Sequence, residues 1–370
     1  MNSGKKILLV FGTRPEAIKM CPVIRELKNR KSFNVVVCVT GQHREMLDRI
    51  LSCFDITADY DLNLMKENQS LFDITAGALD GLRIVLEKEQ PDEVLVQGDT
   101  TTAFAAALAC FYKNIPVGHI EAGLRTYDIG NPYPEEFNRE AISLISRHNF
   151  APTKAAAENL IREGRNAKNI FVTGNTVCDA FRTTISDSYT NPLLDWAKGS
   201  RLVLITSHRR ESLGEKMSNM FRAVRRVLEE HPDVKAIFPM HPNPVVMKTA
   251  ESVFGDMDTI RLIAPLDVVD FHNFMSSSYL ILTDSGGIQE EATILGKPVL
   301  VMRDTTERPE GVSAGTLKLV GTEEEKIYTA FSHLLDDKDA YKKMSLKSDV
   351  YGDGLASKRI ADILEFEVMR

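Results

Sequence analysis

Three acidic residues stand where carboxylates could transfer protons. Asp99 follows the predicted strand Glu93–Val96, Glu121 ends the predicted strand Pro116–Ile120, and Glu135 opens the next predicted helix. Three carboxylates at neighbouring strand ends are more than binding requires, and they indicate general acid–base chemistry. If two of them lie close together, one pKa rises, so that an acid and a base coexist near pH 7.

Each of these positions also has a structural interpretation. Asp99 could be the N-cap of the following helix. Glu135 and its neighbour Glu136 could complement the helix dipole in the first turn, and we expect Glu136 to do only this. Glu121 has no such explanation, because a carboxylate at a buried strand end needs a partner. Arg125 is the candidate partner.

A second group of residues suits an anionic ligand. Residues 283–287, TDSGG, run from a predicted strand into a predicted helix. The adjacent Gly286 and Gly287 would let a phosphate approach the backbone, where the helix N–H groups point at it. The alternative is a helix start capped by Ser285 or Asp284. The pattern matches neither a P-loop nor a dinucleotide-binding fingerprint, so neither ATP hydrolysis nor NAD is indicated.

Basic residues gather at the same kind of position. Arg14 and Lys19 lie near the start of the first predicted helix, where the helix dipole disfavours cations unless an anion is nearby. In the second half, His208, His241 and Arg308 each lie beyond a predicted strand. Arginine matches phosphate bidentately and histidine can donate a hydrogen bond, so these residues predict a diphosphate site.

The elements that would position these residues alternate along the chain. Strands are predicted at Ile7–Phe11, Val35–Thr40, Glu93–Val96, Pro116–Ile120, Leu202–Thr206, Val234–Pro239, Ile260–Ile263, Tyr279–Thr283 and Pro298–Met302. Helices are predicted between them and at the end of the chain, over Ala356–Glu367. Short buried strands alternating with helices predict βαβ units and parallel sheets, whose ligands bind beyond the carboxyl ends of the strands.

The alternation restarts after a polar, turn-rich segment at 184–200, so we expect two domains in the 370 residues. The fold class is α/β, with two Rossmann-like doubly wound parallel-sheet domains facing a cleft. The first, residues 1–183, carries the acids and is completed by the C-terminal helix 355–370. The second, residues 184–354, carries the phosphate-binding residues. A ligand with a diphosphate at one end and a proton-transfer centre at the other fits both, and a sugar nucleotide is such a ligand.

Composition excludes several classes of function. Hydrophobic residues make up 43% and charged residues 26%, which is typical of a soluble globular protein. The net charge of −7 and the lack of a Lys/Arg block argue against nucleic acid. No apolar run is long enough for a membrane span, and the apolar run at Ile7–Phe11 is too short for a signal peptide. The five cysteines are scattered and not spaced as metal ligands, so we expect free thiols and a cytoplasmic location.

These residues, taken in order, resemble the non-hydrolysing UDP-N-acetylglucosamine 2-epimerase family over essentially the whole chain. The matching segments are FGTRPEAIK at 11–19, GDT at 98–100, EAGLRT at 121–126, PEE at 134–136, HRRE at 208–211, DSGGIQEE at 284–291 and RPEG at 308–311. The resemblance implies the two-domain GT-B-like fold of many glycosyltransferases, a homodimer, and no cofactor or metal. It also implies reversible conversion of UDP-N-acetylglucosamine to UDP-N-acetylmannosamine, for cell-surface polysaccharide synthesis.

The resemblance further assigns roles to residues. UDP is eliminated to give 2-acetamidoglucal and is then added back, with Asp99, Glu121 and Glu135 as catalytic acids and bases and His208 assisting the departure of UDP. Together with His241, the residues expected to bind substrate and UDP are Arg14, Lys19, Ser285, Gly286, Gly287, Glu291 and Arg308. A second UDP-N-acetylglucosamine, bound as an allosteric activator, is matched by Gln42, His43, Gln69 and Arg209. Gln97 departs from the histidine that many members have at this position.

Three other functions compete with this one. A hydrolysing 2-epimerase would release UDP and free N-acetylmannosamine. A glycosyltransferase of the same fold would not need three carboxylates in the first domain. A non-catalytic sugar-nucleotide sensor would suffer from uncompensated carboxylates near a diphosphate.

Overall fold

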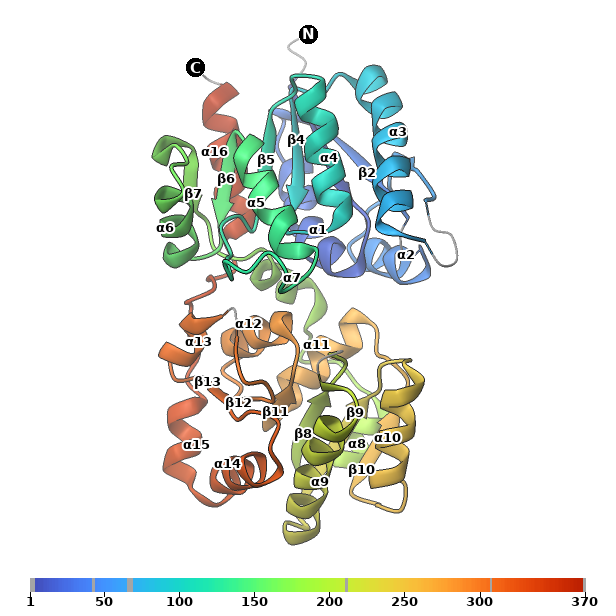
Figure 1. Cartoon of the computed structure of the whole chain (residues 1–370), viewed down its shortest axis with the longest axis vertical. Coiled ribbons are helices and arrows are strands. Elements are labelled where there is room, and N and C mark those ends of the chain that lie inside the picture. Colours follow the sequence, from blue (N-terminus) through green and yellow to red (C-terminus); the bar gives the residue numbers. More distant parts are fainter. Residues whose placement is uncertain (1–3, 42–43, 65–68, 210–211, 307, 369–370) are drawn as a thin grey trace. The chain divides into compact units, whose positions relative to one another are not determined.

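Two separate parallel sheets organise the chain. The computed structural model describes residues 4–41, 44–64, 69–209, 212–306 and 308–368. Unit 1 comprises Met1–Thr183 and Tyr351–Arg370, and unit 2 comprises Thr184–Val350 (Figure 1). Each unit is built around one of the sheets, and each is described by itself below.

The sheet of unit 1 has the strand order β3-β2-β1-β4-β5-β6-β7, and all of its strand pairs are parallel. Its strands are β1 Lys5–Phe11, β2 Phe33–Val39, β3 Tyr60–Asp61, β4 Glu93–Gln97, β5 Val117–Ile120, β6 His148–Ala151 and β7 Ile170–Val172. The order reverses between β1 and β4, which makes the carboxyl ends of these two strands the topological switch point where ligands bind in such sheets.

Helices cover both faces of this sheet. They are α1 Arg14–Lys28, α2 Arg44–Cys53, α3 Leu71–Glu89, α4 Thr101–Tyr112, α5 Glu135–Ile145, α6 Lys154–Arg162, the 3-10 helix Ala167–Asn169, α7 Val177–Thr184 and α16 Ala356–Val368. Leu8 and Val10 pack against α3 and α4, while the alternate residue Leu9 is also fully buried. A strand buried on both faces reads as a continuous apolar run, which is why the sequence predicted β1.

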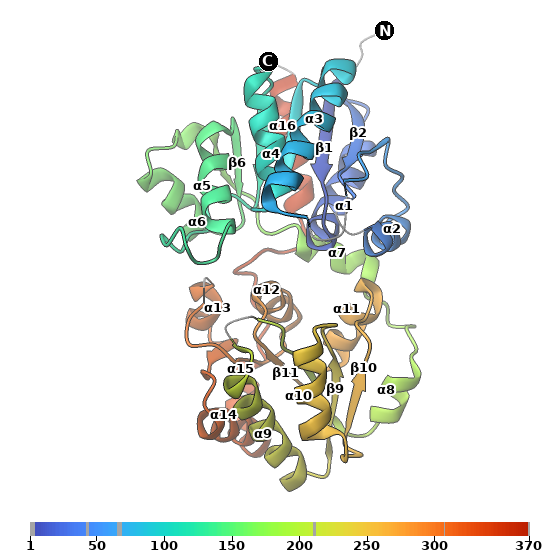
Figure 2. The same cartoon turned by 45° about the vertical axis from the view of Figure 1, so that its right-hand side comes forward.

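The last helix belongs to the first unit. Figure 2 shows α16 beside α1, although the two lie at opposite ends of the chain. Arg30, just after α1, donates from Nη1 to Glu365 Oε2 at 2.8 Å. The chain returns to unit 1 at Tyr351, a few residues before the predicted boundary at 355. The reason is that Tyr351 is buried in unit 1, where its carbonyl accepts from the N–H of Asn175 at 2.6 Å.

The sheet of unit 2 repeats the same pattern, with the order β10-β9-β8-β11-β12-β13 and parallel pairs throughout. Its strands are β8 Arg201–Thr206, β9 Val234–Pro239, β10 Ile260–Ile263, β11 Leu280–Thr283, β12 Val299–Val301 and β13 Leu317–Leu319. Its helices are α8 Pro192–Ala197, α9 Glu215–Glu230, α10 Pro244–Phe254, α11 Val268–Ser277, α12 Gly286–Leu295, α13 Pro309–Ser313, α14 Glu324–Asp336 and α15 Lys338–Met344. The switch point lies between β8 and β11.

The predicted α/β class with two doubly wound parallel sheets is confirmed. The prediction missed the very short strands β3, β7 and β13, as well as β6, whose sequence HNFA is half polar. Within the polar segment 184–200, Asn191 caps the short helix α8 and Trp196 packs on the core of unit 2. No helix within the described residues has the length and apolar character needed to cross a membrane.

Candidate active site

Asp99 is anchored by the helix that begins with Glu135. Its carboxylate accepts from Arg139 Nε at 3.1 Å and from Arg139 Nη2, and its main-chain carbonyl accepts from Asn138 Nδ2 at 2.8 Å. The structural alternative for Asp99 is wrong, because the N-cap of α4 is Thr100, whose side chain accepts from the N–H of Ala103. Asp99 is therefore held for a purpose other than capping.

Glu121 lies in a turn directly after β5 with a φ of 67°. The left-handed conformation costs a non-glycine residue about 1–2 kcal/mol, and such strain concentrates at functional sites. Its Oε2 atom pairs with Lys19 Nζ and accepts from Gln97 Nε2 at 2.9 Å and from Asn175 Nδ2 at 3.4 Å. The anion that the sequence predicted beside Lys19 is thus, in this structure, a carboxylate of the protein.

Arg125, the partner expected for Glu121, has a different role. Its guanidinium binds Glu163, with Nε to Oε1 at 2.7 Å and Nη2 to Oε2 at 2.8 Å, and it also donates to the hydroxyl of Ser143. This bidentate pairing suits the planar guanidinium, and it leaves Lys19 as the cation on Glu121. The expectation for Arg125 was therefore wrong.

Glu136 does more than complement the helix dipole, which was the only role that we expected for it. It is fully buried and accepts from the N–H groups of Thr126 and Tyr127, at 2.7 and 2.8 Å, and from Arg139 Nη1 at 3.0 Å. Glu135, one residue earlier, is only partly buried. The two neighbours therefore differ: Glu136 fastens α5 to the loop before it, and Glu135 is left at the start of the helix.

His119 connects the turn before Asp99 to β5. Its Nε2 atom lies 2.7 Å from the carbonyl oxygen of Gly98, which can only accept, so Nε2 carries the proton. Burial lowers the pKa of His119 to about 4, so the ring is neutral near pH 7. The N–H of Gly98 donates to the carbonyl of Ile120 at 2.9 Å. The Gly98 turn that presents Asp99 is therefore fixed on both sides by β5.

Arg14 is half-buried at the start of α1, where the capping box seen in the structure includes Glu16. The Glu16 carboxylate accepts from the N–H groups of Gly12 and Thr13, at 3.1 and 2.7 Å, and from the Thr100 hydroxyl at 2.7 Å. Burial raises the pKa of Glu16 despite these hydrogen bonds. The turn after β1 is thereby tied to the turn after β4, on the two sides of the switch point.

In unit 2, a buried carboxylate organises the loop after β8. Asp284 accepts from the hydroxyl of Ser207 at 2.9 Å and from the N–H groups of His208 and Arg209, at 2.9 and 3.1 Å. The ring of His208 stacks on His241, with centroids 5.7 Å apart and an interplanar angle of 15°. The structure thus brings together His208, Arg209 and His241 beside the start of α12.

The turn at 285–287 is more open than helix capping requires. Ser285 is the N-cap residue of α12, but its side chain makes no capping hydrogen bond. A Cβ atom at Gly287 would meet nothing closer than Glu291 Oε1, at 3.9 Å. Packing therefore does not demand glycine at this position, which favours the interpretation that the backbone is left clear for a ligand.

The remaining predicted residues of unit 2 lie on or after the same helix. Glu291 Oε2 is 3.6 Å from Nε2 of the buried His272. Arg308 is mostly buried, and its Nε donates to Glu290 Oε1 at 2.7 Å. Arg308 and Glu291 are thus held by protein partners next to the open turn.

The predicted activator residues are only partly described. Gln42 and His43 lie outside the described residues. Gln69 donates from Nε2 to the carbonyl of Leu64 in its own loop, and Arg209 is bonded through its main chain to Asp284. Gln69 and Arg209 are thus each held by a partner within their own unit.

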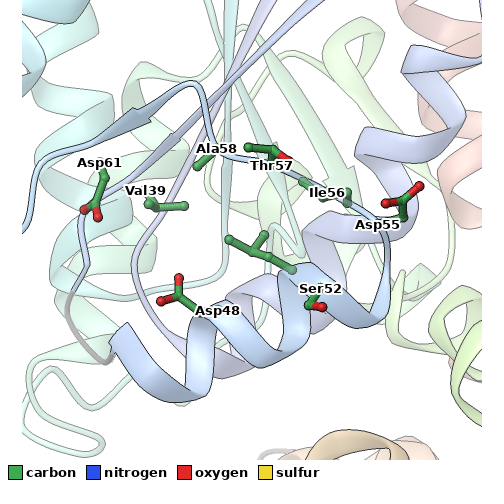
Figure 3. A pocket seen from close by; sticks show the side chains of 9 residues that line it. Val39, Asp48, Ser52, Asp55, Ile56, Thr57, Ala58 and Asp61 are labelled. Carbon is green, nitrogen blue, oxygen red and sulfur yellow. The ribbon is translucent and has the colours of Figure 1, made fainter.

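A cavity of about 420 Å³ lies between β2, α2 and the segment leading to β3. Figure 3 shows the carboxylates of Asp48, Asp55 and Asp61 around it, with Ser52 and Thr57. None of the predicted site residues that the structure describes lines it. Among the described residues, no group of three or more His, Cys, Asp or Glu side chains is arranged to hold a metal ion.

Sequence reasoning missed several residues of this site. Arg139 could have been found, because Glu136, Arg139 and the buried Ile142 recur every three residues along one face of α5. Asn175 could not, because it follows β7, a three-residue strand that the pattern did not predict. The contacts of Asp284 with the loop after β8 could not be predicted either, because they join residues that are 75 or more positions apart in the sequence.

Comparisons with known proteins agree with one another. The family model described as UDP-N-acetylglucosamine 2-epimerase matches residues 25–365. A UDP-N-acetylglucosamine 2-epimerase of Bacillus subtilis is 56% identical over 361 residues, covering 98% of this chain and 95% of the relative.

Solved structures give the same result. A structure of S. aureus MnaA with UDP is 47% identical, with a TM-score of 0.93 over 99% of this chain and 97% of that one. A Neisseria meningitidis UDP-GlcNAc 2-epimerase bound to UDP-GlcNAc is 48% identical, with a TM-score of 0.91 over 97% and 99% of the two chains. The glycotransferase of kitacinnamycin, at 13% identity and a TM-score of 0.66, shares the fold alone.

Proposed function

Because the chain belongs to the UDP-N-acetylglucosamine 2-epimerase family, we propose that it interconverts UDP-N-acetylglucosamine and UDP-N-acetylmannosamine reversibly, without net hydrolysis. The proton on C2 of the sugar is not acidic, so simple deprotonation would be too slow. Instead a base removes this proton while the C1–O bond breaks, and UDP leaves with the electron pair, giving 2-acetamidoglucal. Protonation of C2 on the opposite face and re-addition of UDP at C1 then complete the epimerisation.

The observation that carries this proposal is the acid network of unit 1. Asp99 and Glu121 follow the adjacent strands β4 and β5, and Arg139 joins Asp99 to the helix that starts at Glu135. Inversion at C2 requires one group to remove a proton and another to deliver one from the other face. Asp99, Glu121 and Glu135 are assigned to this work, with Asp99 and Glu121 held in position by Arg139 and Lys19 and Glu135 placed at the start of α5.

We assign the UDP leaving group to residues of unit 2, and we assign Arg14 and Lys19 of unit 1 to substrate binding. The N–H groups of Gly286 and Gly287 and the hydroxyl of Ser285 would bind the diphosphate, with Arg308 adding positive charge. His208, placed by Asp284, would assist the departure of UDP, and the stacked His241 would support it. Glu291 would accept from the ribose hydroxyls. The UDP and UDP-GlcNAc named for the two solved relatives support this assignment.

The product distinguishes this function from its nearest alternatives. Purified protein would be incubated with UDP-N-acetylglucosamine, and the products separated by anion-exchange chromatography. We expect UDP-N-acetylmannosamine, and an equilibrium that is reached from either epimer. Stoichiometric UDP with free N-acetylmannosamine would assign the hydrolysing class, and binding without any conversion would assign a sensor.

A homodimer is the proposed assembly. The helices α3, α4 and α5 pack side by side and expose apolar side chains, namely Ile84, Phe111, Tyr112, Phe137 and Leu144. Exposed apolar groups concentrated on adjacent helices mark an interaction surface. A second copy of the chain is the proposed partner.

Two further assignments rest on the family. A second UDP-N-acetylglucosamine is proposed as an activator through Gln42, His43, Gln69 and Arg209, and a sigmoidal dependence of rate on substrate concentration would support it. A cytoplasmic location is proposed because the five cysteines, all within the described residues, form no disulfide and four of them are buried, as suits a reducing compartment.

A further inference from the structure

Both polar atoms of the Asn175 side chain form hydrogen bonds. Its Oδ1 atom accepts from the N–H of Val177 at 3.1 Å, and its Nδ2 atom donates to Glu121 Oε2 at 3.4 Å. The residue is only 2% exposed. Because the oxygen must face the N–H of Val177, the amino group is the end that faces Glu121, and the orientation of the amide is fixed.

The main chain of Asn175 is held as firmly as its side chain. Its N–H donates to the carbonyl of Tyr351 at 2.6 Å, where the chain re-enters unit 1. Next to this bond, the backbones of Gly174 and Gly352 touch, and a Cβ atom on Gly174 would lie 3.1 Å from Gly352 Cα. Both glycines have positive φ, 88° and 135°. The segment at Tyr351 and Gly352 therefore fixes the position of the loop that carries Asn175.

The groups around the Glu121 carboxylate differ in charge. Lys19 supplies a positive charge from α1, while Gln97 on β4 and Asn175 supply uncharged donors to the same oxygen. His119 on β5 also interacts with Glu121, and its ring is neutral near pH 7 because burial lowers its pKa to about 4. A donor facing a carboxylate stabilises its ionised form over its protonated form.

We propose that Asn175 is a positioning residue for the reaction. Its main chain is held by the segment at Tyr351, and its side-chain amide orients the Glu121 carboxylate and stabilises the negative charge of that carboxylate. The inference rests on the proposed function, in which Glu121 transfers a proton to or from C2. It adds a residue from a loop that no motif of the sequence analysis contains.

The principal test is Asn175→Ser. Serine can form the same local turn as asparagine, so its hydroxyl can still accept from the N–H of Val177 but cannot reach Glu121. A hydrogen bond to a charged group corresponds to a factor of about ten or more, and the 3.4 Å length points to the lower end. We expect kcat to fall about tenfold with little change in KM.

The pH profile separates positioning from a merely structural effect. Loss of the donor raises the pKa of Glu121, so whichever limb of the kcat/KM profile Glu121 sets should move to higher pH by roughly one unit. Asn175→Asp places a second carboxylate beside Glu121 and should move that limb further. A profile that does not move, with turnover reduced only in proportion to lost folded protein, would overturn the inference.

Asn166→Ser and Asn166→Asp are the matched controls. Asn166 has the same local arrangement, with its side chain accepting from the N–H of Lys168 at 3.1 Å, but it is exposed and starts the short 3-10 helix. Both controls should leave the profile unchanged. An equal shift in the controls would show a general charge effect and would also overturn the inference.

A measurement independent of turnover separates this inference from the proposed function. In protein labelled with ¹³C at the glutamate carboxyl, the Glu121 signal is identified by its loss in Glu121→Gln and titrated by NMR. Its pKa should be higher in Asn175→Ser than in wild type, and equal values would overturn the inference. If the wild-type protein makes no UDP-N-acetylmannosamine, the proposed function fails while this titration still decides the role of Asn175 at Glu121.

Discussion

The guanidinium of Arg139 donates to the carboxylate of Asp99 through both Nε, at 3.1 Å, and Nη2. Asparagine at position 99 could still accept from Arg139 but could not transfer a proton. Asp99→Asn should therefore keep the fold and the affinity for UDP, while kcat falls by about 10²–10⁴-fold, the usual contribution of general acid–base catalysis. Steady-state kinetics and titration calorimetry with UDP measure the two effects. Near-normal turnover would make Asp99 a structural partner of Arg139 alone.

Substitution by glutamine should lower the stability of the protein at Glu136 and the turnover number at Glu135. Glu136→Gln removes the charge from a fully buried carboxylate that pairs with Arg139, and breaking such a pair costs about 3–5 kcal/mol. Glu135→Gln should leave the free energy of unfolding nearly unchanged and lower kcat as Asp99→Asn does. Urea unfolding and kinetics on both variants measure this. Unchanged stability of Glu136→Gln, with normal turnover of Glu135→Gln, would reverse the assignment.

The positions of the strand ends could be predicted from the sequence, because the residues that mark a strand end and the turn after it are close together in the chain. The apolar run at Ile7–Phe11 and the glycines at 286 and 287 mark a strand and a turn without reference to the rest of the chain. Residues just after such strands, Asp99 and Glu121 among them, were found in this way. Both domains and their fold class followed from the same alternation of strands and helices.

The partners of those residues could not be predicted, because they come from distant segments. Glu121 meets Lys19, 102 positions away, rather than the nearby Arg125. Helix-dipole complementation explains an acidic residue in a first turn and was the only role expected of Glu136, whereas its buried hydrogen bonds depend on the loop at Thr126 and Tyr127. Local rules therefore identified the acids but not what holds them.

The buried ring of His119 predicts a specific pH dependence of stability. The pKa of His119 falls from 6.5 to about 4 on folding. Between these two pH values the ring is protonated in the unfolded chain but stays neutral in the native state. Stability should therefore fall as the pH is lowered from about 6.5 to about 4, by about 3 kcal/mol from this group. His119→Gln, which can still donate to the carbonyl of Gly98, should lack this component. The comparison is between urea unfolding curves of both proteins across that range, and parallel curves would contradict it.

The exposed apolar helices of unit 1 predict how the dimer can be broken. Leu144 on α5 is 65% exposed, and Leu144→Glu should place a charge in the proposed interface and shift the protein toward monomer. Ile161→Glu on α6, where Ile161 is 52% exposed, is the matched control and should leave the dimer intact. Sedimentation equilibrium measures both. A wild-type protein that is monomeric at micromolar concentration would refute the proposed assembly.

The central claim is that C2 loses its proton to one group and regains a proton from another on the opposite face. Turnover of UDP-N-acetylglucosamine in deuterium oxide, followed by ¹H NMR and mass spectrometry, tests this directly. The acid network of Asp99, Glu121 and Glu135 predicts deuterium at C2 of UDP-N-acetylmannosamine as it forms, and at C2 of both epimers at equilibrium. Epimerised product that retains its original hydrogen at C2 would contradict the elimination route and the roles given to the three carboxylates.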